Sequence, residues 1–125
     1  MVTVCIHLDN NQSEIQWSFL LSNFRPDEIR LLGEYEPTDK IFRDVKRGLP
    51  NKPLIILTPK DGRYMKGDIS LSNFTHPEDA VYVFGSDKKH MEPMDGTLVY
   101  IPTDSNVEMY SWSAGAVVLW DRRCG

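Results

Sequence analysis

The chain has 125 residues, 41% of them hydrophobic, and its 14 Lys and Arg against 18 Asp and Glu give a net charge of −4. A chain of this length buries roughly two-thirds of its unfolded surface, so one hydrophobic core suffices without disulfides or a structural metal. Non-specific attraction to nucleic acid requires a basic protein, so any nucleic-acid contact must use a local patch.

Apolar stretches and cysteines indicate one cytoplasmic domain over residues 1–125. The longest apolar runs, residues 54–57 and 114–120, are far shorter than the roughly 20 residues of a membrane span. The N-terminus lacks the charged start and cleavage site of a signal peptide. Cys5 lies in an apolar run and Cys124 is next to last, so a reducing compartment is the simplest interpretation. No repeat, low-complexity tract or linker divides the chain.

The first half of the chain alternates strand and helix patterns. Residues 2–8 (VTVCIHL) form a β-branched apolar run, which predicts a buried strand. Residues 13–24 carry apolar side chains at four- to five-residue steps, which predicts a helix with Ser13 as its N-cap. Residues 29–32 (IRLL), closed by Gly33, predict a second strand.

A second helix is predicted to start at Thr38 and to end near Gly48. It would carry Ile41, Phe42 and Val45 on one side and four basic residues on the other. We interpret that basic side as a solvated face.

The second half of the chain contains three more apolar runs, residues 54–58 (LIILT), 80–84 (AVYVF) and 97–101 (TLVYI), each of which predicts a strand. Between the first two, residues 69–74 suggest one short element. Residues 107–121 mix apolar and small residues on almost every side. They predict a final helix that is buried on more than one side and lets another backbone approach closely.

Apolar strands that alternate with helices predict an α/β fold, a parallel sheet that is flanked by helices and covered on both faces. Ligands of such sheets bind at the carboxyl ends of the strands. Three of these ends carry suitable turns, at Thr58-Pro59, Gly85-Ser86 and Pro102-Thr103. Ordinary strand-terminating turns would look the same.

Several familiar sites are absent from the sequence. It contains no G-x-G-x-x-G, no P-loop pattern and no G-x-S-x-G elbow. His7, His76 and His90 are far apart and have no second ligand at metal spacing, so no metal site is expected.

An ordered series of motifs resembles the SpoU branch of the SPOUT RNA methyltransferases, which methylates ribose 2′-hydroxyls. VYVFGSD (81–87), VYIPTDS (99–105) and AGAVVLWD (114–121) are similar to that branch's strand ending F-G-x-E, its strand ending I-P-M and its terminal helix ending L-Y-E. Upstream, LDN (8–10) and FRPDEIRLLGE (24–34) extend the resemblance over nearly the whole chain.

The resemblance implies a deep C-terminal trefoil knot, a homodimer packed through the terminal helix, S-adenosylmethionine as cofactor and tRNA or rRNA as substrate. Such a knot is an exception to the rule that chains avoid threading. Carried over by motif, the cofactor-binding residues are Leu57, Thr58, Gly85, Ile101 and Met109.

The catalytic first motif of that branch, N-x-G followed by R-T-A, is not matched. Its Arg helps to activate or stabilise the ribose oxygen, which is a poor nucleophile at neutral pH. Alignment on F-x-x-D-E-I places Phe19 at the Arg position and Ser13 near the Asn position. The candidates for catalytic work are therefore Asp87, Tyr110 and Arg25. Arg30 or Arg43 could supply the missing cation in place of Arg25, and a dimer partner could provide it.

The third motif, S-L-N-x-S, also departs from the branch. Glu108, Tyr110 and Trp112 occupy the positions of its Ser, Asn and Ser. A set of loop cations lies near the predicted strand ends, and we expect two of them, Lys88 and Lys89, to contact RNA phosphate.

Three functional interpretations follow. The chain is an active RNA methyltransferase, a SPOUT-like module that binds S-adenosylmethionine or RNA without catalysis, or an unrelated flavodoxin-like binding domain.

Overall fold

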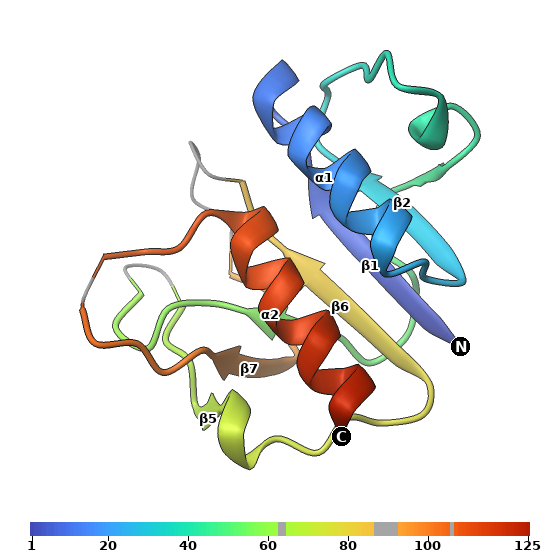
Figure 1. The fold of residues 1–125 in the computed structure, drawn as a ribbon. Coiled ribbons are helices and arrows are strands. Elements are labelled where there is room, and N and C mark those ends of the chain that lie inside the picture. Colours follow the sequence, from blue (N-terminus) through green and yellow to red (C-terminus); the bar gives the residue numbers. More distant parts are fainter. Residues whose placement is uncertain (63–64, 87–92, 106) are drawn as a thin grey trace.

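The structure is a computed structural model that describes residues 1–62, 65–86, 93–105 and 107–125. Within these residues the chain forms a seven-stranded parallel sheet, in the order β3-β2-β1-β6-β4-β7-β5, and two α-helices (Figure 1). The parallel α/β fold predicted from the apolar strands is confirmed.

Five strands match the predicted ones within a residue at each end: β1 Val2–His7, β2 Glu28–Leu32, β4 Ile55–Leu57, β6 Ala80–Phe84 and β7 Thr97–Tyr100. Two short edge strands, β3 Lys46–Arg47 and β5 Ile69–Ser70, complete the sheet. The chain fills the sheet out of order. β6 lies between β1 and β4, and β7 lies between β4 and β5.

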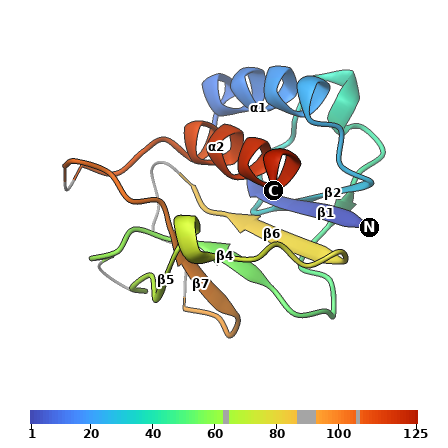
Figure 2. The same cartoon turned by 60° about the horizontal axis from the view of Figure 1, so that its bottom comes forward.

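Both helices, α1 Asn11–Asn23 and α2 Ser111–Cys124, lie side by side on the same face of the sheet (Figure 2). The main core lies beneath them and includes Trp17 and Phe84. The described connections after β2 and β4 contain no α-helix.

The opposite face of the sheet is covered by connecting segments. Cys5, Ile56 and Val83 are fully buried there, and Met65 and Met94 pack against this second cluster. The apolar strands thus need cover on both faces, as predicted, but loops supply it on one of them.

The start of α1 differs from the prediction. Asn10, and not Ser13, is the N-cap, and its side chain accepts a hydrogen bond of 2.9 Å from the Ser13 backbone N–H. The helix therefore begins two residues earlier than the apolar pattern indicates, at Asn11.

The predicted helix from Thr38 is wrong. The chain instead forms a short 3-10 helix at Lys40–Phe42, capped by Asp39, and then the edge strand β3 beside β2. Thr38 does not cap the helix, because its N–H and hydroxyl both donate to the carboxylate of Glu14. Phe42 is buried, so the apolar side of the pattern reaches the core without an α-helix.

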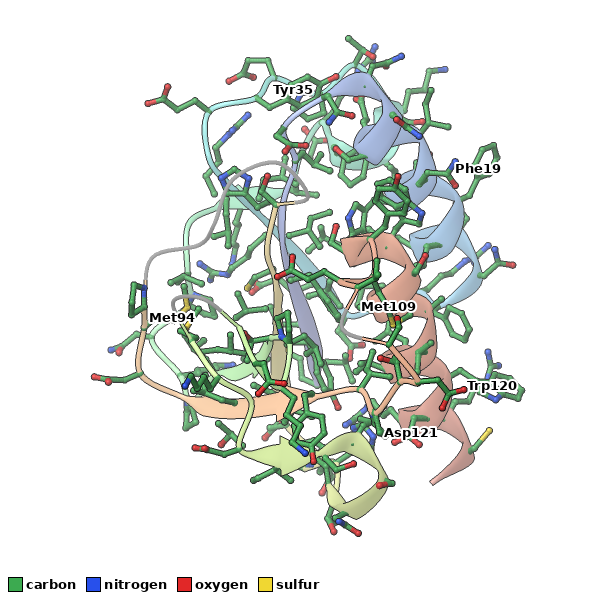
Figure 3. The ribbon with its side chains drawn as sticks, turned by 90° about the vertical axis from the view of Figure 1, so that its left-hand side faces the viewer. Phe19, Tyr35, Met94, Met109, Trp120 and Asp121 are labelled. Carbon is green, nitrogen blue, oxygen red and sulfur yellow. The ribbon has the colours of Figure 1, made fainter. Side chains whose placement is uncertain are left out.

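The terminal helix α2 begins at Ser111, later than predicted, because residues 107–110 lie along a pocket described below. It buries Gly115, Val118 and Leu119. The predicted burial on several sides is not found in the single chain, since Trp120 is 57% exposed and points away from the sheet on the same side as Phe19 of α1 (Figure 3). None of the described helices has the length and apolar character needed to cross a membrane.

Candidate functional site

A pocket of about 470 Å³ opens at the carboxyl ends of β4, β6 and β7. Four stretches line it: residues 57–62 after β4, 84–86 after β6, 99–103 after β7, and 107–111 at the entry to α2. This is the edge of a parallel sheet where strand-end loops converge and where ligands of α/β proteins bind.

All five residues predicted to bind a cofactor line this one pocket. They are Leu57, Thr58, Gly85, Ile101 and Met109. Because they lie at the ends of three different strands and before α2, only the parallel fold brings them together. Their common location agrees with the motif assignment, while binding itself stays a prediction.

The loop after β4 is held by its own hydrogen bonds. The Thr58 hydroxyl donates to the Met65 carbonyl at 2.9 Å, and the Thr58 N–H donates to the Val99 carbonyl on β7 at 3.0 Å. A Cβ at Gly62 would collide with the Met65 carbonyl, so only glycine fits this turn. These contacts tie both ends of the wall formed by residues 57–62 to neighbouring backbone.

A polar group at the end of β1 reaches the pocket through Ser86. Asp9 accepts hydrogen bonds from the Ser86 hydroxyl and, through its other oxygen, from the Asn10 side chain at 2.9 Å and the Ser13 hydroxyl at 3.3 Å. Sequence reasoning did not assign Asp9 or Ser86. The sequence does show that LDN (8–10) and FGS (84–86) each follow an apolar strand pattern. The contact between these two segments depends on the pairing of β1 with β6.

Three charged side chains line the described part of the pocket: Lys60, Asp61 and Glu108. The Lys60 ammonium lies over the Tyr100 ring, 5.6 Å from its centre. Tyr110, one of the predicted catalytic candidates, also lines the pocket, and its side chain is 59% exposed. The pocket therefore offers one cation, two carboxylates and an accessible aromatic ring.

Of Arg25, Asp87, Lys88 and Lys89, the structure describes Arg25 alone, and it lies away from the pocket. Arg25 precedes β2, and the neighbouring Asp27 N–H donates to the Val2 carbonyl at the start of β1, so Arg25 sits at the opposite edge of the sheet. Within its own chain Arg25 does not line the pocket. Asp87, Lys88 and Lys89 lie outside the described residues.

The chain matches no protein-family model, and no curated protein is significantly similar to it. Its fold is similar to that of several solved RNA methyltransferases. A protein from Porphyromonas gingivalis, assigned to the TrmH family of RNA methyltransferases, superposes with a TM-score of 0.69 at 13% identity. The match covers 99% of this chain but 60% of that one, so this chain spans under two-thirds of its neighbour's length.

Two further structures give similar values. A protein solved to study 2-OH methylation of C/U34 on tRNA has a TM-score of 0.71 at 11% identity, with 98% of this chain and 94% of that chain covered. An AdoMet-bound rRNA methyltransferase from Sinorhizobium meliloti has a TM-score of 0.70 at 13% identity, with 98% and 56% covered. The chain thus has the fold of the TrmH and SpoU type of RNA methyltransferase, as its ordered motifs indicate.

Proposed function

We propose that this chain is an S-adenosylmethionine-dependent RNA methyltransferase of the SPOUT type that acts on a ribose 2′-hydroxyl of tRNA or rRNA. The observation that carries the proposal is the single strand-end pocket, which all five motif-assigned cofactor residues line. The fold similarity to RNA methyltransferases supports the same reaction class.

The pocket suits S-adenosylmethionine. Its volume of about 470 Å³ lies within the range of small-molecule sites, roughly 300 to 1,000 Å³. Leu57, Ile101 and Met109 offer apolar surface for the adenine, while Thr58 and the backbone at Gly85 offer polar groups. Bound there, the cofactor would supply an electrophilic methyl group.

Methyl transfer requires that the ribose hydroxyl lose its proton as the new oxygen–carbon bond forms. Within the described pocket, the carboxylates of Asp61 and Glu108 can take this proton, and so can Asp9 through the Ser86 hydroxyl. Lys60 supplies positive charge for the oxygen as it becomes negative. These groups would replace the Asn and Arg of the family's first motif, which this chain lacks.

A second candidate function is a non-catalytic module that binds S-adenosylmethionine or RNA. The observation that favours it is Phe19, which stands at the position of the family Arg and is 65% exposed on α1. An apolar side chain cannot stabilise a developing negative charge.

The proposal includes a homodimer and a knotted chain. Phe19, Val117 and Trp120 leave apolar surface exposed on α1 and α2, which supports pairing with a second copy. The knot is included because the motif resemblance implies it. Light scattering at micromolar concentration should give twice the chain mass, and a monomer would contradict the dimer.

Calorimetric titration with S-adenosylmethionine is the first test, with wild type and Ile101→Asp compared. A carboxylate in the apolar part of the pocket should abolish binding, whereas the matched Leu49→Asp change, at an exposed leucine outside the pocket, should not. No binding to wild type at millimolar ligand would reject the proposed methyltransferase.

Transfer of a tritiated methyl group to total RNA then separates the two candidate functions. Methyl incorporation by wild type that is lost in Ile101→Asp supports the methyltransferase. Cofactor binding without incorporation supports the non-catalytic module.

A further inference from the structure

Two aromatic rings stack at the mouth of the pocket. The Tyr110 and Trp112 rings are nearly parallel, with an interplanar angle of 8° and centroids 4.5 Å apart. Tyr110 lines the pocket directly, and Trp112 follows in the first turn of α2. The pair is therefore a preformed flat surface beside the proposed methyl-donor site.

The two rings have different surroundings. Trp112 is partly buried and packs against the main core, so it is fixed from behind. Tyr110 covers the outer side of Trp112 and is still 59% exposed. Because one face of the Tyr110 ring rests on Trp112, the opposite face is the one that a flat ligand can reach.

The Tyr110 side chain does not stabilise the helix that it precedes, although the Tyr110 backbone carbonyl accepts a hydrogen bond of 3.0 Å from the Ala114 N–H. Tyr110 occupies the N-cap of α2, where Ser, Thr, Asp or Asn would stabilise the first turn, and its side chain makes no capping hydrogen bond. The sequence thus gives up a stabilising residue to place an exposed aromatic ring there. Departures from local preference are expected at functional or strained positions.

A flat, exposed ring suits a flat, uncharged ligand surface. Nucleobases stack on aromatic side chains whatever their sequence, because every base has a π-face. A base inside a duplex already has both faces stacked, so an unpaired base is the species free to use the ring. A base on Tyr110 would hold the attached ribose at the mouth of the pocket.

We propose that Tyr110, supported from behind by Trp112, is a stacking platform for an unpaired base of the RNA substrate. This inference rests on the proposed function, since it takes RNA as the substrate. It assigns the role to the aromatic ring and not to the phenolic hydroxyl, which separates it from a catalytic role for Tyr110.

The test compares Tyr110→Ala, Tyr110→Leu and Tyr110→Phe with wild type. Leucine keeps apolar surface without a ring, and phenylalanine keeps the ring without the hydroxyl. Fluorescence anisotropy would measure binding of a short, mixed-sequence, single-stranded RNA and of the duplex with the same sequence. Calorimetry with S-adenosylmethionine would measure the cofactor affinity of each variant. Light scattering would measure its oligomeric state.

We expect the alanine and leucine variants to bind the single strand about tenfold more weakly than wild type. The phenylalanine variant should stay within about twofold, and duplex RNA, cofactor affinity and oligomeric state should not change. Single-strand binding that is equal in all four proteins would overturn the platform. A phenylalanine variant as weak as the alanine variant would overturn the role of the ring in favour of the hydroxyl.

Other outcomes also overturn the platform. A parallel loss of cofactor affinity would assign the ring to the cofactor, and a change in mass would assign it to the dimer. If wild type binds S-adenosylmethionine but no RNA, the platform fails while a cofactor-binding function stands. If wild type binds neither, the proposed function itself fails.

Discussion

Gly115 of α2 lies against the indole ring of Trp17 on α1, so the absence of a side chain at 115 sets how closely the two helices approach. A Cβ at this position would lie 2.5 Å from Cη2 and 2.9 Å from Cζ3 of Trp17. The ring has no room to withdraw. It is fully buried, its Nε1 donates to the Ser111 hydroxyl at 3.2 Å, and its centroid is 5.1 Å from that of Phe84.

Gly115→Ala should therefore destabilise the protein. Overpacking costs about 1–3 kcal/mol, while alanine gains about 1 kcal/mol over glycine in a helix, so we expect a net loss of up to about 2 kcal/mol. Urea denaturation measures it. In a Trp17→Phe background the smaller ring leaves space, and the same substitution should become neutral or stabilising. If Gly115→Ala alone were as stable as wild type, α2 would be able to move away from Trp17 without an energetic cost.

The buried carboxylate of Glu14 ties α1 to the segment before the 3-10 helix. Glu14 is 1% exposed and accepts hydrogen bonds from the Thr38 N–H at 2.8 Å and the Thr38 hydroxyl at 3.0 Å. The Tyr35 hydroxyl adds a longer bond of 3.4 Å. A charged acceptor is thus satisfied entirely by donors from one loop.

Glu14→Gln should lower the free energy of unfolding by about 2 kcal/mol, because an amide NH₂ group would face a donor where an oxygen now accepts. The matched control is Glu36→Gln. Glu36 is 84% exposed and pairs with Arg47, so its loss should change stability by less than about 0.5 kcal/mol. Chemical denaturation of both variants measures their free energies of unfolding. Equally small losses in the two variants would mean that Glu14 does not hold the loop.

The strands of the central sheet were predictable because each is a local apolar run, as in residues 80–84. The edge strand β3 was not, since a two-residue strand of charged side chains carries no such pattern. The segment from Thr38 fits a helix by its apolar spacing alone. Its actual form depends on Glu14, a partner 24 residues earlier in the chain.

The pocket could be located from sequence because strand ends are local features and a parallel sheet places them at one edge. Leu57, Gly85 and Ile101, which line the pocket, lie at such predictable strand ends. The contact of Ser86 with Asp9 joins residues 77 positions apart and depends on strand order, which no local pattern specifies. The start of α2 likewise depends on contacts across the fold.

The last turn of α2 is held to the loop before β6 by Arg122. Its guanidinium donates to the Pro77 carbonyl at 2.6 Å, the Glu78 carbonyl at 3.0 Å and the Tyr82 hydroxyl at 3.1 Å. We expect Arg122→Ala to cost about 1–2 kcal/mol and to speed amide exchange in the last turn. Arg123→Ala, at the adjacent exposed position, should do neither. Unchanged exchange in the first variant would contradict the anchor.

Cys5 gives the protein a pH-dependent stability at alkaline pH. Burial in the loop-covered face raises the pKa of its thiol to about 12, against a small opposing effect of Arg30. Below the ordinary thiol pKa of about 8.5 the group is protonated in both the folded and the unfolded chain, so it adds no pH dependence. Above it, the unfolded chain releases the proton and the folded chain keeps it, so the free energy of unfolding must fall as pH rises toward 12. The limiting slope for one group is about 1.4 kcal/mol per pH unit.

Denaturation between pH 8 and 10 tests this slope, because the buried Tyr82, whose pKa is also raised by burial, begins to contribute only near the upper end of that range. Cys5→Ala removes the titrating group and should leave a flatter profile, even though the lost sulfur lowers stability equally at every pH. Cys124→Ser, at an exposed thiol, should keep the wild-type slope. Since only the thiolate is nucleophilic, a disulfide reagent at pH 8 should label Cys124 quickly and Cys5 only at the rate of unfolding. Rapid labelling of both thiols in the native protein would mean that the loop-covered face of the sheet opens to solvent.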